Sequence, residues 1–295
     1  MSRFVALSVV AGWILLPVQT AAPPVVVHGW VENEAWQAET DLRREDFEVL
    51  VDRVPVALES VTARQGPASI VLLLDATRTT LWMPRPLDEQ LGIFAASLGP
   101  EDRLLFASLG EKATFSSFGP ANRDIRDDVR RAAEDGAERG FGNSPVWDAL
   151  HEAVTRLAAE PPPRSILLLS DGRATGNKHG LVEVADYAMA NSVAINIVLR
   201  HAPQRIRQGP QTAVLVQPGA PLEVLTAYTG GVIFYYPELQ DDQTRARFGH
   251  LAASVRALHA FAFTAPVRDG QPHRLDIRST RPGIKVHTPL AFLAR

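Results

Sequence analysis

Two aspartates stand where apolar runs of the sequence end. Asp75 follows the run at residues 69–74, and Asp171 follows the run at residues 165–169 after one serine. A run that is apolar at every position is typical of a central strand in a parallel sheet. Ligands of a doubly wound sheet bind beyond the carboxyl ends of its strands, where the strand order reverses. If the two runs are the first and fourth strands of a 3-2-1-4-5 sheet, we expect the two carboxylates to be neighbours.

Hydroxyl side chains accompany these carboxylates. Thr77 and Thr79 follow Asp75, and Ser144 stands in a glycine-containing loop just before an amphipathic segment. Two neighbouring carboxylates repel unless a cation lies between them, and ligands that are all oxygen suit Mg²⁺, with Mn²⁺ or Ca²⁺ as alternatives. So few ligands would leave a position for a carboxylate from elsewhere. The predicted metal ligands are Asp75, Thr77, Thr79, Ser144 and Asp171.

Each of these residues also has a simpler interpretation. Asp75 can cap the segment that follows it, and Ser144 can cap the helix that begins after it. Asp171 and Gly172 together form a common turn sequence after a strand. The joint occurrence of two strand-end aspartates and three hydroxyls favours the metal site over these separate explanations.

Other chemistries find little support. The chain has 295 residues and no cysteine, which excludes disulfides, thiol nucleophiles and cysteine-based metal sites. Its histidines show no spacing typical of zinc ligands, and a net charge of −3 gives no general attraction to nucleic acid or anionic membrane. The sequence Asp-Ala-Thr-Arg-Thr from Asp75 resembles haloacid dehalogenase-type phosphatases, but Thr77 replaces their second aspartate. We therefore expect a protein that is not an enzyme.

The elements that must position these residues alternate along the middle of the chain. This alternation predicts an α/β fold with a doubly wound, mostly parallel sheet flanked by helices. The expected strands are 69–74, 102–109, 113–118, 165–169, 193–199, 232–236 and 260–264, and the expected helices are 87–98, 122–134, 145–159, 181–190, 222–228 and 244–258. Residues 204–219 are expected to form a surface loop.

Both ends of the chain are predicted to be β-rich extensions that form one small sheet together. The expected strands there are 25–30, 48–51, 56–62, 274–279 and 284–288, with a helical turn within 41–47.

The order of the candidate ligands resembles that of the von Willebrand factor type A (vWA) domain. The metal-ion-dependent adhesion site of that family is Asp-x-Ser-x-Ser, then a Thr, then an Asp. Here Asp75, Thr77 and Thr79 match the triplet, Ser144 the threonine, and Asp171 the last aspartate. The resemblance covers about residues 67–264. Segments 41–49, 228–235 and 273–278 further resemble an exported bacterial vWA-related group.

This sequence departs from the family pattern at every hydroxyl, because Thr replaces Ser twice and Ser replaces Thr once. Arg78 also stands within the triplet, where a small residue is common; it either weakens metal binding or contacts an acidic partner. The resemblance implies that the loops after Asp75, around Gly142 and after Asp171 contact the partner. Arg78, Asn143 and Gly172 are the expected partner-binding residues.

The first residues have the layout of a secretory signal peptide. One arginine precedes the apolar run 4–16, and Pro17 and small residues follow it. An uncleaved anchor is the alternative. We expect a signal peptide at 1–22, an N-terminal extension at 23–65, a vWA domain at 66–264 and a C-terminal extension at 265–295, in a protein exported to the periplasm or secreted, with no membrane span after cleavage.

The function implied by the resemblance is binding of another protein that offers a carboxylate to the metal, with no role for nucleic acid. Two alternatives remain open. The first is a scaffold with a degenerate metal site that binds through its β-rich extensions, and the second is a metal-dependent hydrolase.

Overall fold

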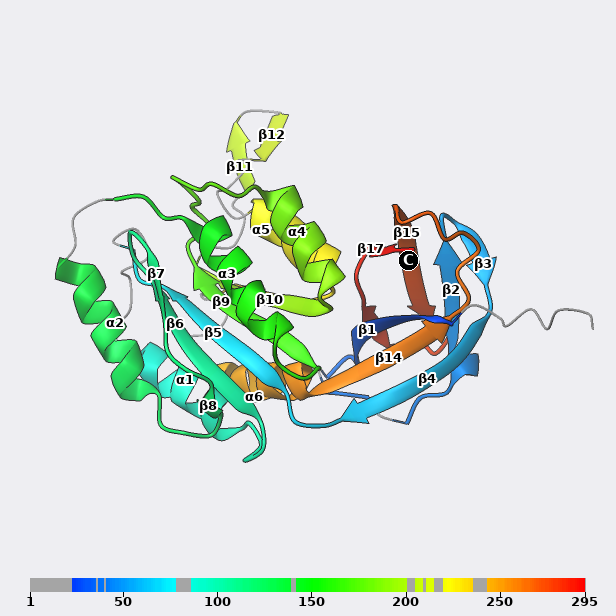
Figure 1. The fold of residues 1–295 in the computed structure, drawn as a ribbon, viewed down its shortest axis with the longest axis horizontal. Helices are drawn as coiled ribbons and strands as arrows, with labels where there is room; N and C mark the ends of the chain where they lie inside the picture. Colours follow the sequence, from blue (N-terminus) through cyan, green and yellow to red (C-terminus); the bar gives the residue numbers. More distant parts are fainter. Residues whose placement is uncertain are drawn as a thin grey trace, which may run out of the picture.

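The structure is a computed structural model with two lobes side by side (Figure 1). It describes residues 23–35, 37–39, 41–77, 86–138, 142–200, 205–208, 211–214, 220–235 and 243–294. The predicted signal peptide at 1–22 and the predicted site residues Arg78 and Thr79 lie outside these ranges. In the described part of the chain, no helix is both long and apolar enough to cross a membrane.

The central lobe is built on a sheet with the strand order β13-β10-β9-β5-β6-β7. Parallel pairing joins β5 (Ser69–Asp75), β6 (Arg103–Leu109), β9 (Arg164–Ser170), β10 (Val193–Leu199) and β13 (Ile233–Tyr235). The short strands β7 (Ala113–Phe115) and β8 (Gly119–Pro120) pair with β6 in the antiparallel sense. Counted along the chain, β7, β6, β5, β9 and β10 give the predicted order 3-2-1-4-5, which confirms the α/β fold class.

Helices cover both faces of this sheet (Figure 1). One face packs on α1 (Pro86–Ala96), α2 (Arg126–Glu138) and α6 (Gln243–Arg256). The other packs on α3 (Val146–Ala158), α4 (Leu181–Ala190) and α5 (Ala220–Thr229). All seven residues of β5 are buried because alternate side chains enter the two cores. This two-sided burial explains why the strand is apolar at successive positions.

The outer lobe consists of two four-stranded antiparallel sheets whose inner faces share one core. The first has the order β16-β1-β14-β4, from β16 (Lys285–His287), β1 (Val25–Glu32), β14 (Ala257–Phe263) and β4 (Leu58–Gln65). The second has the order β17-β15-β2-β3, from β17 (Ala291–Leu293), β15 (Pro272–Ser279), β2 (Phe47–Val51) and β3 (Val54–Val56). The single-turn helix η1 (Arg44–Asp46) precedes β2.

Three sequence predictions are wrong here. The ends of the chain form two sheets rather than one. The strand expected at 260–264 as the last strand of the central part is β14, which pairs with β1 and β4 because Phe261 and Phe263 are buried in the outer core. The expected loop at 204–219 contains a hairpin of β11 (Arg205–Gln208) and β12 (Gln211–Val214). The prediction failed because glycine and proline stand between two short segments, which made the whole stretch resemble a loop.

Candidate metal centre

Asp75 is the last residue of β5 and is fully buried. Its position in the alternation matches that of Val71 and Leu73, whose side chains pack in the core under α3. Ser170, the last residue of β9, holds the equivalent position on the neighbouring strand. The loop before α3 brings Ser144 to the same place.

Three hydroxyls from three segments of the chain converge on the Asp75 carboxylate. Thr77 donates to Oδ1 from its hydroxyl at 2.7 Å and from its backbone amide at 3.2 Å. Ser170 donates to Oδ2 at 2.7 Å, and Ser144 lies 3.4 Å from the same oxygen. Of the predicted ligands, the structure therefore brings Asp75, Thr77 and Ser144 together.

Burial raises the pKa of the Asp75 carboxyl, and the nearby charge of Asp171 raises it further, whereas the hydrogen bonds from Ser170 and Thr77 lower it. The direction shows that desolvation outweighs the hydroxyl donors. A buried carboxylate beside another acid favours a cation as a neighbour. Without a cation, burial therefore favours the protonated, neutral form of the Asp75 carboxyl.

Asp171 is also buried and lies just beyond the end of β9. Its Oδ1 accepts the backbone N–H of Arg173 at 3.0 Å, which is the turn expected from the simpler interpretation. The Arg173 Nε lies 3.8 Å from Oδ2, and the Arg173 side chain is 59% exposed. Because the guanidinium approaches from the solvent side, a cation at Asp171 would share its carboxylate with Arg173.

The loop 171–180 is fastened to the start of α3. Ser144 donates its backbone N–H to Thr175 Oγ1 at 3.0 Å, and the Thr175 N–H donates to the Ser144 carbonyl at 2.9 Å. The helix itself has no side-chain cap at Pro145. Instead, Asn177 Oδ1 accepts the N–H of Trp147 at 2.7 Å. Because the cap comes from this loop, the Ser144 hydroxyl is directed at Asp75 rather than at the helix.

The predicted partner-binding residues differ in exposure. Asn143 is exposed and packs so closely on Gly176 that a Cβ there would lie 2.5 Å from its side chain. Gly172 is buried with a φ of +86°, and its N–H donates to Ser170 Oγ at 3.1 Å. Of these two residues, only Asn143 presents a side chain at the surface.

Ser170 belongs to the site although it was not among the predicted ligands. Its hydroxyl connects the Asp75 carboxylate with the Gly172 amide, so it orders both strand ends. The available signal was the alternation of β9. Ile166 and Leu168 point under α3, so Ser170 continues the row that faces Asp75.

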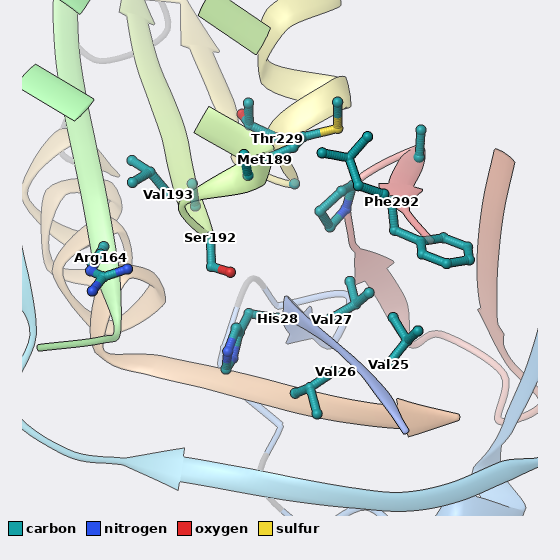
Figure 2. Close-up of a pocket in the computed structure, with 16 residues that line it drawn as sticks. Val25, Val26, Val27, His28, Arg164, Met189, Ser192, Val193, Thr229 and Phe292 are labelled. Carbon is teal, nitrogen blue, oxygen red and sulfur yellow. The ribbon is translucent and has the colours of Figure 1, made fainter. Parts of the chain in front are cut away.

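A cavity of about 190 Å³ lies between the two lobes, at the starts of β9 and β10 and thus at the edge of the sheet opposite Asp75. Figure 2 shows Ser192, Val193 and Thr229 on the side of the central lobe and Val27 and Phe292 on the side of the outer lobe. The guanidinium of Arg164, also in its lining, donates to three backbone carbonyls. Among the described lining residues there is no carboxylate, so this cavity does not compete as a site for a hard cation.

No family model matches the sequence, and no curated protein matches it. Solved structures do. BatB, a conserved hypothetical protein from Bacteroides thetaiotaomicron, is 12% identical over 64% of this chain and 98% of that one, with a TM-score of 0.46. A von Willebrand factor type A protein from Catenulispora acidiphila is 11% identical over 95% of this chain and 76% of that one, with a TM-score of 0.47.

A third similar structure is that of proximal thread matrix protein 1 from the mussel byssus, with a zinc-occupied metal-ion-dependent adhesion site. It is 16% identical over 66% of this chain and 47% of that one, with a TM-score of 0.42. All three TM-scores are below 0.5, so the fold class rests on the strand order of the structure itself. The central sheet has the doubly wound strand order that the apolar runs of the sequence predict. The chain therefore has a doubly wound α/β fold with helices on both faces of the sheet.

Proposed function

We propose that this vWA-like protein binds another protein through a divalent cation held beside Asp75. The observation that carries the proposal is the convergence of the Thr77, Ser144 and Ser170 hydroxyls on one fully buried carboxylate. Such a cluster lies at the edge of the sheet where doubly wound folds bind ligands. Thr79 and Asp171 would complete the ligand set, with Mg²⁺ as the expected ion and Mn²⁺ or Ca²⁺ as alternatives.

A cation there would supply a coordination position for a carboxylate of the partner. The residues of the chain do the rest: Asp75 provides the charge, and the hydroxyls provide neutral oxygen ligands. The exposed Asn143 and Arg173 flank the position and provide polar contacts for an acidic partner. We assign no catalytic step to these residues.

We further propose that the protein acts outside the cytoplasm. The support is the apolar segment 4–16, preceded by a positive charge and followed by Pro17 and small residues.

The test is capture of envelope proteins on the immobilised mature chain, with Mg²⁺ or with EDTA. Asp75→Asn removes the central charge while keeping the side-chain shape, and Asp186→Asn, an exposed carboxylate on α4, is the matched control. A partner retained by wild type and Asp186→Asn in Mg²⁺, and lost in EDTA and with Asp75→Asn, supports the proposal. A partner retained equally in EDTA and by Asp75→Asn refutes it and favours the scaffold alternative.

A further inference from the structure

A second group of possible ligands lies on the surface formed by α3 and α4. His151 belongs to α3, Glu183 belongs to α4, and His179 lies on the loop that joins β9 to α4. One ligand atom from each of the three lies within 4.8 Å of the others. The histidines of the sequence have no spacing typical of zinc ligands, because this cluster forms only when the loop folds back on α3.

The side chains of the cluster are already in contact. His179 Nδ1 lies 2.9 Å from Glu183 Oε1. The imidazole rings of His151 and His179 stack with centroids 3.9 Å apart and an interplanar angle of 1°. The His151 ring also stacks on Tyr187, with centroids 4.5 Å apart. His151 is thus held by the Tyr187 ring, and His179 is held by Glu183, which is the third ligand.

The backbone around the cluster is also fixed. Asp148, one turn before His151 on α3, accepts the backbone N–H groups of Lys178 and His179 at 2.8 and 2.9 Å. Glu183 follows His179 by four residues, within the first turn of α4. Two helices and one anchored loop therefore set the separation of the three ligands, which reduces the ordering that ion binding requires.

The chemistry of the cluster differs from that at Asp75. Two imidazole nitrogens and one carboxylate oxygen suit Zn²⁺, Ni²⁺ or Cu²⁺, whereas Mg²⁺ prefers oxygen alone. Tetrahedral Zn²⁺ with bonds of about 2.0–2.1 Å places its ligand atoms about 3.3 Å apart. To bind the ion, the three ligand atoms would move closer together than their present separation of up to 4.8 Å. One of the stacked imidazole rings would tilt so that a nitrogen of each points at the ion. The side chains of His179 and Glu183 are 31% and 56% exposed, which leaves room for this movement and for entry.

We propose that His151, His179 and Glu183 form a binding site for a transition-metal ion of the Zn²⁺ class, separate from the site at Asp75. The fourth position is left for water or for a ligand from outside. The ion would join α3 to α4 through the loop 171–180, whose other end carries Asp171. Occupancy therefore stabilises the loop that supplies one of the acids of the candidate metal centre.

The test is titration of the untagged, chelator-treated mature chain with Zn²⁺ by calorimetry, and with Co²⁺ by its visible absorption, in the presence of millimolar Mg²⁺. The variants are His179→Gln and Glu183→Gln. His250→Gln, a partly exposed histidine on α6, is the matched control, and Asp75→Asn reports on the other site. Circular dichroism of the metal-free variants checks that each is folded.

We expect one equivalent of Zn²⁺ to bind wild type, His250→Gln and Asp75→Asn alike, and His179→Gln and Glu183→Gln to bind at least tenfold more weakly. Equal Zn²⁺ affinity in wild type and His179→Gln overturns the proposal, as does a wild type that binds no Zn²⁺ at 100 µM. Because Asp75→Asn is tested separately, loss of the site at Asp75 leaves this result unaffected.

Discussion

Replacing Asp75 by Asn tests the candidate metal centre most directly. Asn keeps an oxygen that accepts from Thr77, and its amide meets the Ser170 and Ser144 hydroxyls, which can rotate to accept. The change removes a buried charge whose pKa is raised by burial. We therefore expect the metal-free variant to fold and to be at least as stable as wild type at neutral pH.

The response to metal should differ sharply between the two proteins. A ligand that binds only the folded state stabilises it by about 2.7 kcal/mol when its concentration is 100 times Kd. At an unfolding entropy of about 2.1 cal/mol/K per residue, each kcal/mol raises the Tm of a chain of this size by about 1.7 °C, so Mg²⁺ at 100 times Kd should raise the wild-type Tm by about 4–5 °C. Asp75→Asn should show no shift. The assay is thermal unfolding of both proteins in EDTA and in a series of Mg²⁺ concentrations.

The pH dependence gives an independent check on the same carboxylate. Because the pKa of Asp75 is higher in the folded than in the unfolded chain, the folded state holds the proton more tightly. Stability of the metal-free wild type should therefore rise as the pH falls through the folded pKa, and the gain is complete below the unfolded value of about 3.9. Asp75→Asn lacks this contribution.

For the Mg²⁺ titration, a Tm shift of equal size in Asp75→Asn and wild type would refute the assignment of Asp75 as a ligand.

Three further predictions concern one residue at the site and two elsewhere in the fold. Ser170→Ala removes the acceptor of the Gly172 N–H and a donor to Asp75, so urea unfolding should show a loss of about 1–3 kcal/mol, and unchanged stability would contradict the role given to this hydroxyl. Gly231→Ala would place a Cβ 2.0 Å from the carbonyl oxygen of Ile195, so the free energy of unfolding should fall by about 3 kcal/mol or more. The control is Gly249→Ala on α6, where a Cβ meets open space and which should unfold no more easily than wild type. Burial lowers the pKa of His259, so the unfolded chain takes up a proton there at higher pH than the folded chain does. Stability should therefore fall as the pH drops below about 6.5. If stability falls equally steeply in His259→Phe, His259 is not the cause.

The sequence predicted the central lobe well because its signals are local. A strand buried on both faces, such as β5, is apolar at successive positions, and a helix such as α3 repeats its apolar residues at helical spacing. The outer lobe was harder, because β1 pairs with β14 from the far end of the chain. No local pattern specifies which distant strand becomes the partner, so two sheets were mistaken for one.

The same distinction holds for the candidate site. Asp75 and Ser144 could be found because each adjoins a strongly patterned element. Ser170 was missed because only the register between β5 and β9 places its hydroxyl beside Asp75. The cluster of His179 with His151 was missed for a related reason, since it depends on how the loop 171–180 docks on α3.

The pairing of β4 with β14 has a consequence for biosynthesis. The chain leaves the outer lobe after β4 and re-enters it at β14, so the whole central lobe is an insertion between two adjacent strands. The partners of β1 are β14 and β16, both near the other end of the chain. During synthesis from the N-terminus, β1 therefore has neither of these sheet partners until the inserted lobe has left the ribosome. The inserted lobe can fold first, and its compact shape would bring β4 and the start of β14 together, which shortens the search that closes the outer lobe.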